Sequence, residues 1–234
     1  MIPRRVYEHV TTHNWFAVAI DFVIVVVGVF IGIQVSNWNE ARKTSSAQSA
    51  LLERLDDEFE ALEPVLSRWV DEMQATTAST AAVVNALRVE APPNDLAAFR
   101  KDLAQANFVR SMPALPANYI ALVSSGGIAS IENDRLRVAL IRYGDAHAQA
   151  ERFYPAALAA VFDPQANYFT AVDWAMDPAA WESGDAILSY DWERLKASRA
   201  EMQAWVTFQN ELVEQSKNQL EAVRTIRSIL EKRS

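Results

Sequence analysis

The sequence contains no cysteine and only three histidines, His9, His13 and His147, which lie far apart along the chain. The absence of cysteine excludes disulfides, thiol nucleophiles and cysteine-ligated zinc. The three histidines have no spacing typical of a metal site or a catalytic triad. Basic residues are also in the minority, with 22 Lys and Arg against 30 Asp and Glu and a formal net charge of −8. We therefore expect no nucleic-acid partner, since phosphate binding needs a basic surface.

Glycine is scarce as well, with six residues in a chain of 234. Half of the residues are hydrophobic, and most of the others have high helix propensity, so the composition favours helix throughout. The length leaves room for a membrane anchor and one domain of roughly 190 residues with its own core. No catalytic residue, cofactor site or metal site is recognisable, and we do not expect an enzyme.

The longest apolar stretch runs from Trp15 to Trp38 and carries one acidic residue, Asp21. As a helix it would extend about 36 Å, enough to cross a hydrocarbon core of about 30 Å. Tryptophan at each end suits the membrane–water boundary. A signal peptide should end in a small-residue cleavage site, whereas this segment continues into polar residues. We predict a transmembrane helix over residues 15–38, in contact with membrane lipid.

Small and acidic residues share one face of this predicted helix. Asp21, Gly28 and Gly32 fall on one stripe at roughly 100° per residue. The Gly-x-x-x-Gly spacing permits close approach of a second helix, so we expect a homo-oligomer or a membrane-protein partner. A carboxylate inside a membrane is costly unless it is paired, protonated or near water. Asp21 therefore either reaches toward the headgroups or faces a partner or a proton.

Basic residues on the two sides of the segment predict its orientation. Arg4 and Arg5 lie in a polar tail over residues 1–14, and Arg42 and Lys43 follow the segment. The free α-amino group tips this balance toward the N-terminal side. We predict a cytoplasmic N-terminus and a C-terminal domain outside the cytoplasm, which for a protein of the bacterial inner membrane is the periplasm.

A heptad pattern after the membrane segment predicts one long stalk helix over residues 39–90. Mostly apolar residues alternate three and four positions apart, as in a coiled coil or a long bundle helix. They are Leu52, Leu55, Phe59, Leu62, Leu66, Trp69, Met73, Thr76, Thr80, Val83 and Leu87. Pro64 should bend this helix, and the pair Pro92–Pro93 should end it, with Asn94 as the cap of the next helix.

Residues 91–190 are predicted to form a helical cap. A short helix is expected over 95–108, another is closed by Gly126, and a third begins with Asn133 as its N-cap. Further along, Pro155, Pro164 and Pro178 are expected to break the chain into short pieces.

Aromatic residues gather in the second half of this cap. Their rings either pack the cap over the ends of the long helices or line a pocket for a small ligand or a partner peptide. The candidate lining residues are Tyr168, Phe169, Trp174 and Trp181.

A second long helix is predicted over residues 191–234. Its apolar face comprises Leu195, Met202, Trp205, Leu212, Leu220, Val223, Ile226 and Leu230. Its length nearly matches that of the stalk helix, so we expect the two to pair antiparallel. Leu87 would then lie near Leu195, and Leu52 near residues 226–230.

Two groups of residues resemble an uncharacterised bacterial family of small single-pass membrane proteins of unknown function. The first comprises the acidic residue in the anchor, Val26-Val27-Gly28, Gln34 and Asn37-Trp38-Asn39-Glu40. The second comprises Ser124-Ser125-Gly126, Ile131, Asn133 and Leu136-Arg137. The resemblance covers most of the chain and implies a topology but no activity. The chain departs from the family pattern at Asp21, where Glu is frequent, and at Gly32, where Ala is usual.

We therefore expect an all-α fold, in which a transmembrane helix continues into an elongated antiparallel bundle with a helical cap. The expected function is that of a membrane-anchored scaffold or signalling module that oligomerises through its anchor and stalk. One alternative is an ion-coupled subunit that uses Asp21, since Ile20-Asp21-Phe22-Val23 is similar in layout to flagellar-type stator B subunits. No peptidoglycan-binding sequence is recognisable, which weakens that alternative. The other is a sensor with a ligand in the aromatic cap.

Overall fold

The computed structural model describes residues 15–106, 108, 110–161, 163, 165–183 and 185–233, so the predicted tail over 1–14 lies outside the described residues. The chain forms two compact units, Met1–Leu52 and Glu53–Ser234, and each is described by itself. Helices make up most of both, and the predicted all-α fold is confirmed.

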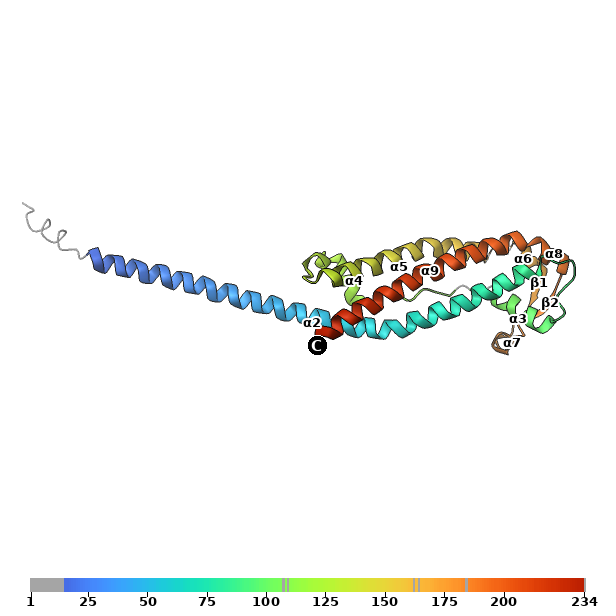
Figure 1. Cartoon of the computed structure of the whole chain (residues 1–234), viewed down its shortest axis with the longest axis horizontal. Coiled ribbons are helices and arrows are strands. Elements are labelled where there is room, and N and C mark those ends of the chain that lie inside the picture. The colour runs from blue at the N-terminus through green and yellow to red at the C-terminus, as the bar shows by residue number, and fades with distance from the viewer. Residues whose placement is uncertain are drawn as a thin grey trace, which may run out of the picture. The chain divides into compact units, whose positions relative to one another are not determined.

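The first described element, helix α2, spans Trp15–Ala86 and is 72 residues long (Figure 1). It contains both the predicted membrane segment and the predicted stalk helix, without a break between them. Pro64 lies inside the helix at an exposed position, where water can bind the carbonyl that loses its N–H donor. The helix ends before residue 90, in a turn where the N–H of Val89 donates to the carbonyl of Ala86 at 3.3 Å.

The unit Glu53–Ser234 is built around three long helices, which are the second part of α2, α5 (Asp134–Val161) and α9 (Arg199–Leu230). The predicted heptad face of α2 lies in its core. Leu52 and Leu62 are half-buried, and the other nine positions are buried. The face predicted for the C-terminal helix is buried from Leu195 to Leu230. Each fully buried large side chain contributes about 1.5–3 kcal/mol, so these two faces supply much of the stability.

Helix α9 runs antiparallel to α2. Near one end, Nη1 of Arg227 lies 2.7 Å from Oε2 of Glu63. At the other end, Leu87 and Leu195 belong to one core cluster, which also contains Trp205. Residue numbers therefore rise along α2 as they fall along α9, and the predicted antiparallel pairing is confirmed. The proximity of Leu52 to residues 226–230 stays a prediction.

Helix α5 is the element that the sequence analysis misplaced. It packs along α9 as the third helix of the bundle, and not in a cap beyond two long helices (Figure 1). The indole N–H of Trp205 donates to the carbonyl of Ala160 at 3.0 Å, and Ala150 shares a core cluster with Leu212. Pro155 does not break the chain, because α5 continues through it. Its exposed position leaves water access to the unpaired carbonyl, which limits the cost.

The end of the bundle where α5 begins is covered by helix α4 (Ala117–Ser124) and the short 3-10 helix η1 (Gly127–Ser130) (Figure 1). Gly126 stands between them with φ 70°, so the predicted glycine closure is confirmed. Asn133 accepts the N–H of Leu136 at 3.1 Å, which confirms it as the N-cap of α5.

Tyr119 fastens α4 to the bundle. Its ring packs edge-on against Phe59 and Tyr143, and its hydroxyl donates to the carbonyl of Leu140 at 3.2 Å. Glycine at position 144 permits this approach, since a Cβ there would lie 2.1 Å from the Tyr119 hydroxyl. Burial raises the pKa of Tyr119, so the hydroxyl stays a donor at physiological pH.

The opposite end of the bundle carries the cap, formed by residues 96–106 and 166–197 (Figure 1). Its helices are α3 (Leu96–Ala106), α6 (Asn167–Ala171), α7 (Pro178–Ser183) and α8 (Trp192–Ala197). Strands β1 (Val172–Trp174) and β2 (Ile187–Tyr190) pair antiparallel, with a register shift after Asp173. The predicted helical cap therefore also contains a two-stranded sheet, which the sequence analysis did not predict. β-branched and aromatic residues in two short runs are the local reason for the strands.

Two helix boundaries also differ from the prediction. Asp95, and not Asn94, caps α3 by accepting the N–H of Ala98 at 3.0 Å. The C-terminal helix is not continuous, because α8 ends at Ala197 and α9 begins at Arg199. Between them the hydroxyl of Ser198 donates to the carbonyl of Leu195 at 2.7 Å. Such local side-chain bonds compete with helix continuation.

Candidate interaction surfaces

The first part of α2 is apolar on every side. All described side chains from residue 19 to residue 35 are exposed, with Phe22 at 69% and Phe30 at 60%. Among the described residues, α2 is the one helix long and apolar enough to cross a membrane. An apolar stretch without a polar face does not suit water, so this surface calls for lipid or for other apolar helices.

The three predicted helix-contact residues lie on this surface. Asp21, Gly28 and Gly32 are exposed, and a Cβ added to either glycine would meet no atom within 4 Å. Helical periodicity aligns the three on one face. That face is open to a second helix, and its use as a contact stays a prediction.

The predicted juxtamembrane residues Asn37, Trp38, Asn39 and Glu40 occupy the next turn and are exposed. The guanidinium of Arg42 lies 5.9 Å from the centre of the Trp38 ring. Thr44 donates its hydroxyl proton to the carbonyl of Glu40 at 3.0 Å. A cation over an indole suits the headgroup region of a membrane.

A charged cluster joins α2 to α9 within the bundle. Glu63 binds both Arg224, at 3.1 Å, and Arg227, at 2.7 Å. The hydrogen bond from Arg227 lowers the pKa of Glu63. Asp56, close by, has one carboxylate oxygen buried without a hydrogen-bond partner among the described residues. Burial raises the pKa of Asp56, so the pKa values of the two carboxylates are shifted in opposite directions.

Several polar side chains are buried in the middle of the bundle. His147 on α5 is 5% exposed, and its Nε2 lies 3.4 Å from Oε1 of Glu151. On α9, Ser216 and Gln219 are buried, and each has a polar atom without a hydrogen-bond partner among the described residues. Among these described residues, no group of three or more His, Asp or Glu is arranged to hold a metal ion.

The four aromatic residues proposed for the cap pack on one another. Tyr168 is fully buried and donates its hydroxyl proton to the carbonyl of Leu103 at 2.7 Å. Phe169 packs edge-on against Tyr168, with the ring centres 5.7 Å apart. Trp174 and Trp181 stack with an interplanar angle of 5° and centres 5.2 Å apart. The structure thus brings the four together in one ring cluster.

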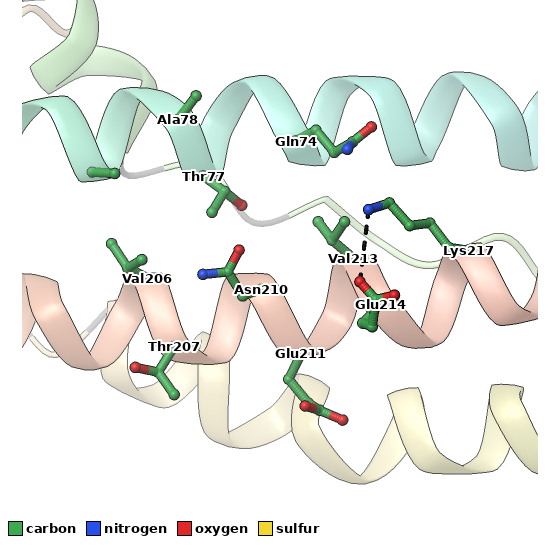
Figure 2. A pocket seen from close by; sticks show the side chains of 11 residues that line it. Gln74, Thr77, Ala78, Val206, Thr207, Asn210, Glu211, Val213, Glu214 and Lys217 are labelled. Carbon is green, nitrogen blue, oxygen red and sulfur yellow. Dashed lines mark ion pairs between the residues drawn. The ribbon is translucent and has the colours of Figure 1, made fainter.

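A groove of about 710 Å³ separates α2 from α9 (Figure 2). Thr77 from α2 and Val206 and Asn210 from α9 extend into it. Farther along, Nζ of Lys217 lies 3.6 Å from Oε2 of Glu214. These two charges, both on α9 beside the groove, therefore already satisfy each other within one helix.

A second groove, of about 980 Å³, runs between α5 and α9. Its floor consists of small side chains, since Ala139, Ala146 and Ala222 line it and are buried. Its rims carry charged residues of both signs, including Arg142 on α5 and Glu221 on α9. Both are exposed, and neither side chain forms an ion pair with a described residue.

Sequence reasoning missed this second groove because it missed the pairing of α5 with α9. The available signal was the spacing of Ala139 and Ala146, which lie seven residues apart on a helix whose neighbouring inward positions, Leu136, Leu140 and Tyr143, are large. Small residues at heptad spacing leave a furrow where large residues would fill the surface.

These features define a class of protein: an all-α chain in which a helix able to cross a membrane continues into a helical bundle. Comparison with protein families narrows the class. The chain belongs to the family of unknown function DUF6090, whose model matches residues 21–178. The match begins at Asp21 and so includes most of the apolar segment, the rest of α2 and α5, and it ends before α9. Neither the curated proteins nor the solved structures gave a match.

Proposed function

We propose that this protein is a single-pass membrane protein whose bundle is a scaffold or signalling module and not an enzyme. The observation that carries the proposal is the continuity of α2, which joins an exposed apolar segment to the core of the bundle in one helix. Because no loop interrupts α2, a change in what the anchor binds would reach the bundle through a continuous helix.

We further propose the orientation and the location. The N-terminal side of the segment would be cytoplasmic and the bundle periplasmic in a bacterial inner membrane, on the basis of Arg4 and Arg5. Alkaline phosphatase fused after Ser234 should be active in intact cells. An inactive phosphatase, together with an active cytoplasmic reporter at the same position, would reverse the orientation.

The anchor is proposed to associate through Gly28 and Gly32. Replacing both by Leu should reduce self-association of the anchor in a membrane reporter assay, because bulky side chains hold the backbones apart. The matched control is Val26→Leu with Phe30→Leu, which alters the opposite face of the helix. If both variants associate equally, the contact does not lie on the glycine face.

An ion-coupled subunit is the second candidate, and the exposed carboxylate of Asp21 on an otherwise apolar segment favours it. Such a subunit should copurify with a multi-span membrane protein and lose activity on Asp21→Asn. The identity of the proteins that copurify with the detergent-solubilised chain separates this candidate from a scaffold.

A ligand sensor is the third candidate. The N–H of Trp174 favours it, because this donor is buried in the ring cluster without a hydrogen-bond partner among the described residues. A ligand that accepts this hydrogen bond should raise the melting temperature of the protein, and the increase should grow with the logarithm of the ligand concentration. A scaffold without a ligand site should melt at an unchanged temperature across a library of small aromatic and polar compounds.

A further inference from the structure

The groove between α5 and α9 carries Arg142 on the α5 rim and Glu221 on the α9 rim, at nearly the same level. The two helices run antiparallel, since Trp205 bonds to Ala160 and Leu212 shares a core cluster with Ala150. The groove therefore extends from residues 134 and 232 at one end to residues 149 and 215 at the other. Counted from the second end, Arg142 is seven residues away on α5 and Glu221 is six residues away on α9. At 1.5 Å per residue, the two therefore lie within about one helical turn of the same height.

These two side chains do not satisfy each other within the chain. Arg142 and Glu221 form no ion pair with any described residue, in contrast to Arg227 and Glu63 on the other side of α9. Between them lies the alanine floor, and Val138, which also lines the groove, is 45% exposed. The surface thus combines an apolar strip with an unpaired cation on one edge and an unpaired anion on the other.

A second copy of the same chain fits this surface. In a twofold dimer with its axis along the groove, α5 of one copy faces α9 of the other, and heights along the axis are preserved. Arg142 of each copy then faces Glu221 of its partner copy, so the same contact forms twice. Two chains anchored in one membrane with the same orientation can be related by a twofold axis along the membrane normal.

We propose that the α5/α9 groove is the face through which the bundles of two copies associate. This inference rests on the proposed function, because it names the contact by which the anchored scaffold dimerises outside its membrane segment. The small floor residues permit close approach of the partner, and the two charge pairs fix the register.

Charge exchange tests the register in the full-length chain in detergent. Arg142→Glu alone and Glu221→Arg alone should each weaken dimerisation by about tenfold, because each places like charges together twice. The double variant should restore the dimer. It exchanges the charges at positions 142 and 221, so opposite charges again face each other in both contacts. The control is Arg68→Glu, a charge reversal at another exposed arginine that lines neither groove, which should leave dimerisation unchanged. Thermal unfolding of each variant identifies any variant that fails to fold.

Crosslinking tests which groove is used, and the cysteine-free sequence makes the background clean. Two differently tagged chains, one with Val138→Cys and one with Ser228→Cys, should crosslink to each other in membranes. Chains with Ala78→Cys and Thr207→Cys, at the rims of the α2/α9 groove, should not. Crosslinking of only this second pair would overturn the proposal.

The outcomes also separate this inference from the proposed function. A full-length chain that is oligomeric but unaffected by both charge reversals overturns the groove contact and leaves association through the anchor intact. A full-length chain that is monomeric in membranes overturns both the groove contact and the association through the anchor. Loss of the dimer on either reversal and its return in the double variant supports the groove contact.

Discussion

The two parts of helix α2 share one backbone and have opposite surfaces. In the first part, from Ala19 to Val35, every described side chain is exposed although most are apolar. In the second part, apolar side chains recur at heptad spacing and are buried, as Leu66 and Met73 are, while the positions between them are mostly polar. The comparison teaches that helix formation does not distinguish the two parts. The distribution of apolar residues around the helix does, because it determines which medium can cover them.

The buried face of the second part also includes polar side chains. Between Phe22 and Ile33, in the first part, no residue has a polar side chain. Thr76, Thr77 and Thr80 are buried in the bundle. Thr77 and Thr80 donate their hydroxyl protons to backbone carbonyls one turn earlier, Thr77 at 2.8 Å and Thr80 at 2.9 Å. A bundle core can include such groups because the helix itself satisfies them.

The largest effect should come from placing charge on the first part. Val26→Lys with Val29→Lys should release the protein from the membrane fraction, since each lysine near a bilayer centre costs about 2.5–3.5 kcal/mol. Ala75→Lys with Ala82→Lys, at exposed positions of the second part, should leave the protein in that fraction. Extraction at alkaline pH measures the distribution. Retention of the Val26/Val29 variant in the membrane would contradict the assignment of an anchor.

The next effect concerns the core face of the second part. Leu66→Ala should lower the free energy of unfolding by about 2–5 kcal/mol, because Leu66 is fully buried and its truncation leaves a cavity. Its neighbour Val65 is 49% exposed, and Val65→Ala should change that free energy by less than about 0.5 kcal/mol. Urea titration followed by circular dichroism measures both, and equal losses would refute the heptad assignment.

The charged contact between α2 and α9 should have a smaller effect, with a defined pH dependence. The pKa of Glu63 is lowered by its bond to Arg227, so this contribution is present above the ordinary value of 4.5 and is lost as the pH falls through the lowered pKa. Glu63→Gln should reduce stability at neutral pH by about 1–2 kcal/mol and remove this acid-dependent loss. The control is Glu214→Gln, in a more exposed pair with Lys217.

The contribution of Asp56 to stability should have the opposite pH dependence. Its raised pKa means that the folded state binds a proton more readily, so stability falls as the pH rises from the ordinary value of 3.8 through the raised pKa. Asp56→Asn should therefore stabilise the protein at neutral pH, whereas Glu63→Gln should destabilise it. Melting temperatures of the two variants that shift in the same direction would contradict these opposite signs.

The smallest effect should come from the buried threonines. Thr80 donates to the carbonyl of Thr76 and lies 3.4 Å from the carbonyl of Ala106, which also accepts from Gln209 at 3.4 Å. Thr80→Val should change the free energy of unfolding by no more than about 1 kcal/mol. The carbonyl of Thr76 keeps its bond within the helix, and the carbonyl of Ala106 keeps its bond from Gln209. A loss of several kcal/mol in the same urea titration would show that the hydroxyl has a further role.

The helical periodicity of the sequence was sufficient to predict the two paired faces. The heptad spacing from Leu55 to Leu87 and the stripe from Leu195 to Leu230 both lie in the core, and the caps at Gly126 and Asn133 follow from local turn chemistry. These features depend on residues close together in sequence. Local pattern therefore suffices for them.

The features that sequence reasoning missed depend on contacts between distant segments. Nothing local shows that α5 lies along α9, and proline at position 155 argued against so long a helix. The strands β1 and β2 are only three and four residues long, too short for a periodic signal. The α5/α9 groove follows from the packing of α5, so the alanine spacing alone could not place it, and the levels of Arg142 and Glu221 were not accessible to sequence analysis.

The stacked indoles of the cap give this protein an intrinsic spectroscopic probe of that region. Two chromophores that lie nearly parallel and in contact, as Trp174 and Trp181 do, share their excited states, and this coupling falls steeply when the rings separate. The near-ultraviolet circular dichroism of the folded chain should therefore contain a signal that Trp181→Phe removes. Because both rings lie in the cap, that signal would follow opening or ligand binding there while the far-ultraviolet signal of the long helices stays constant.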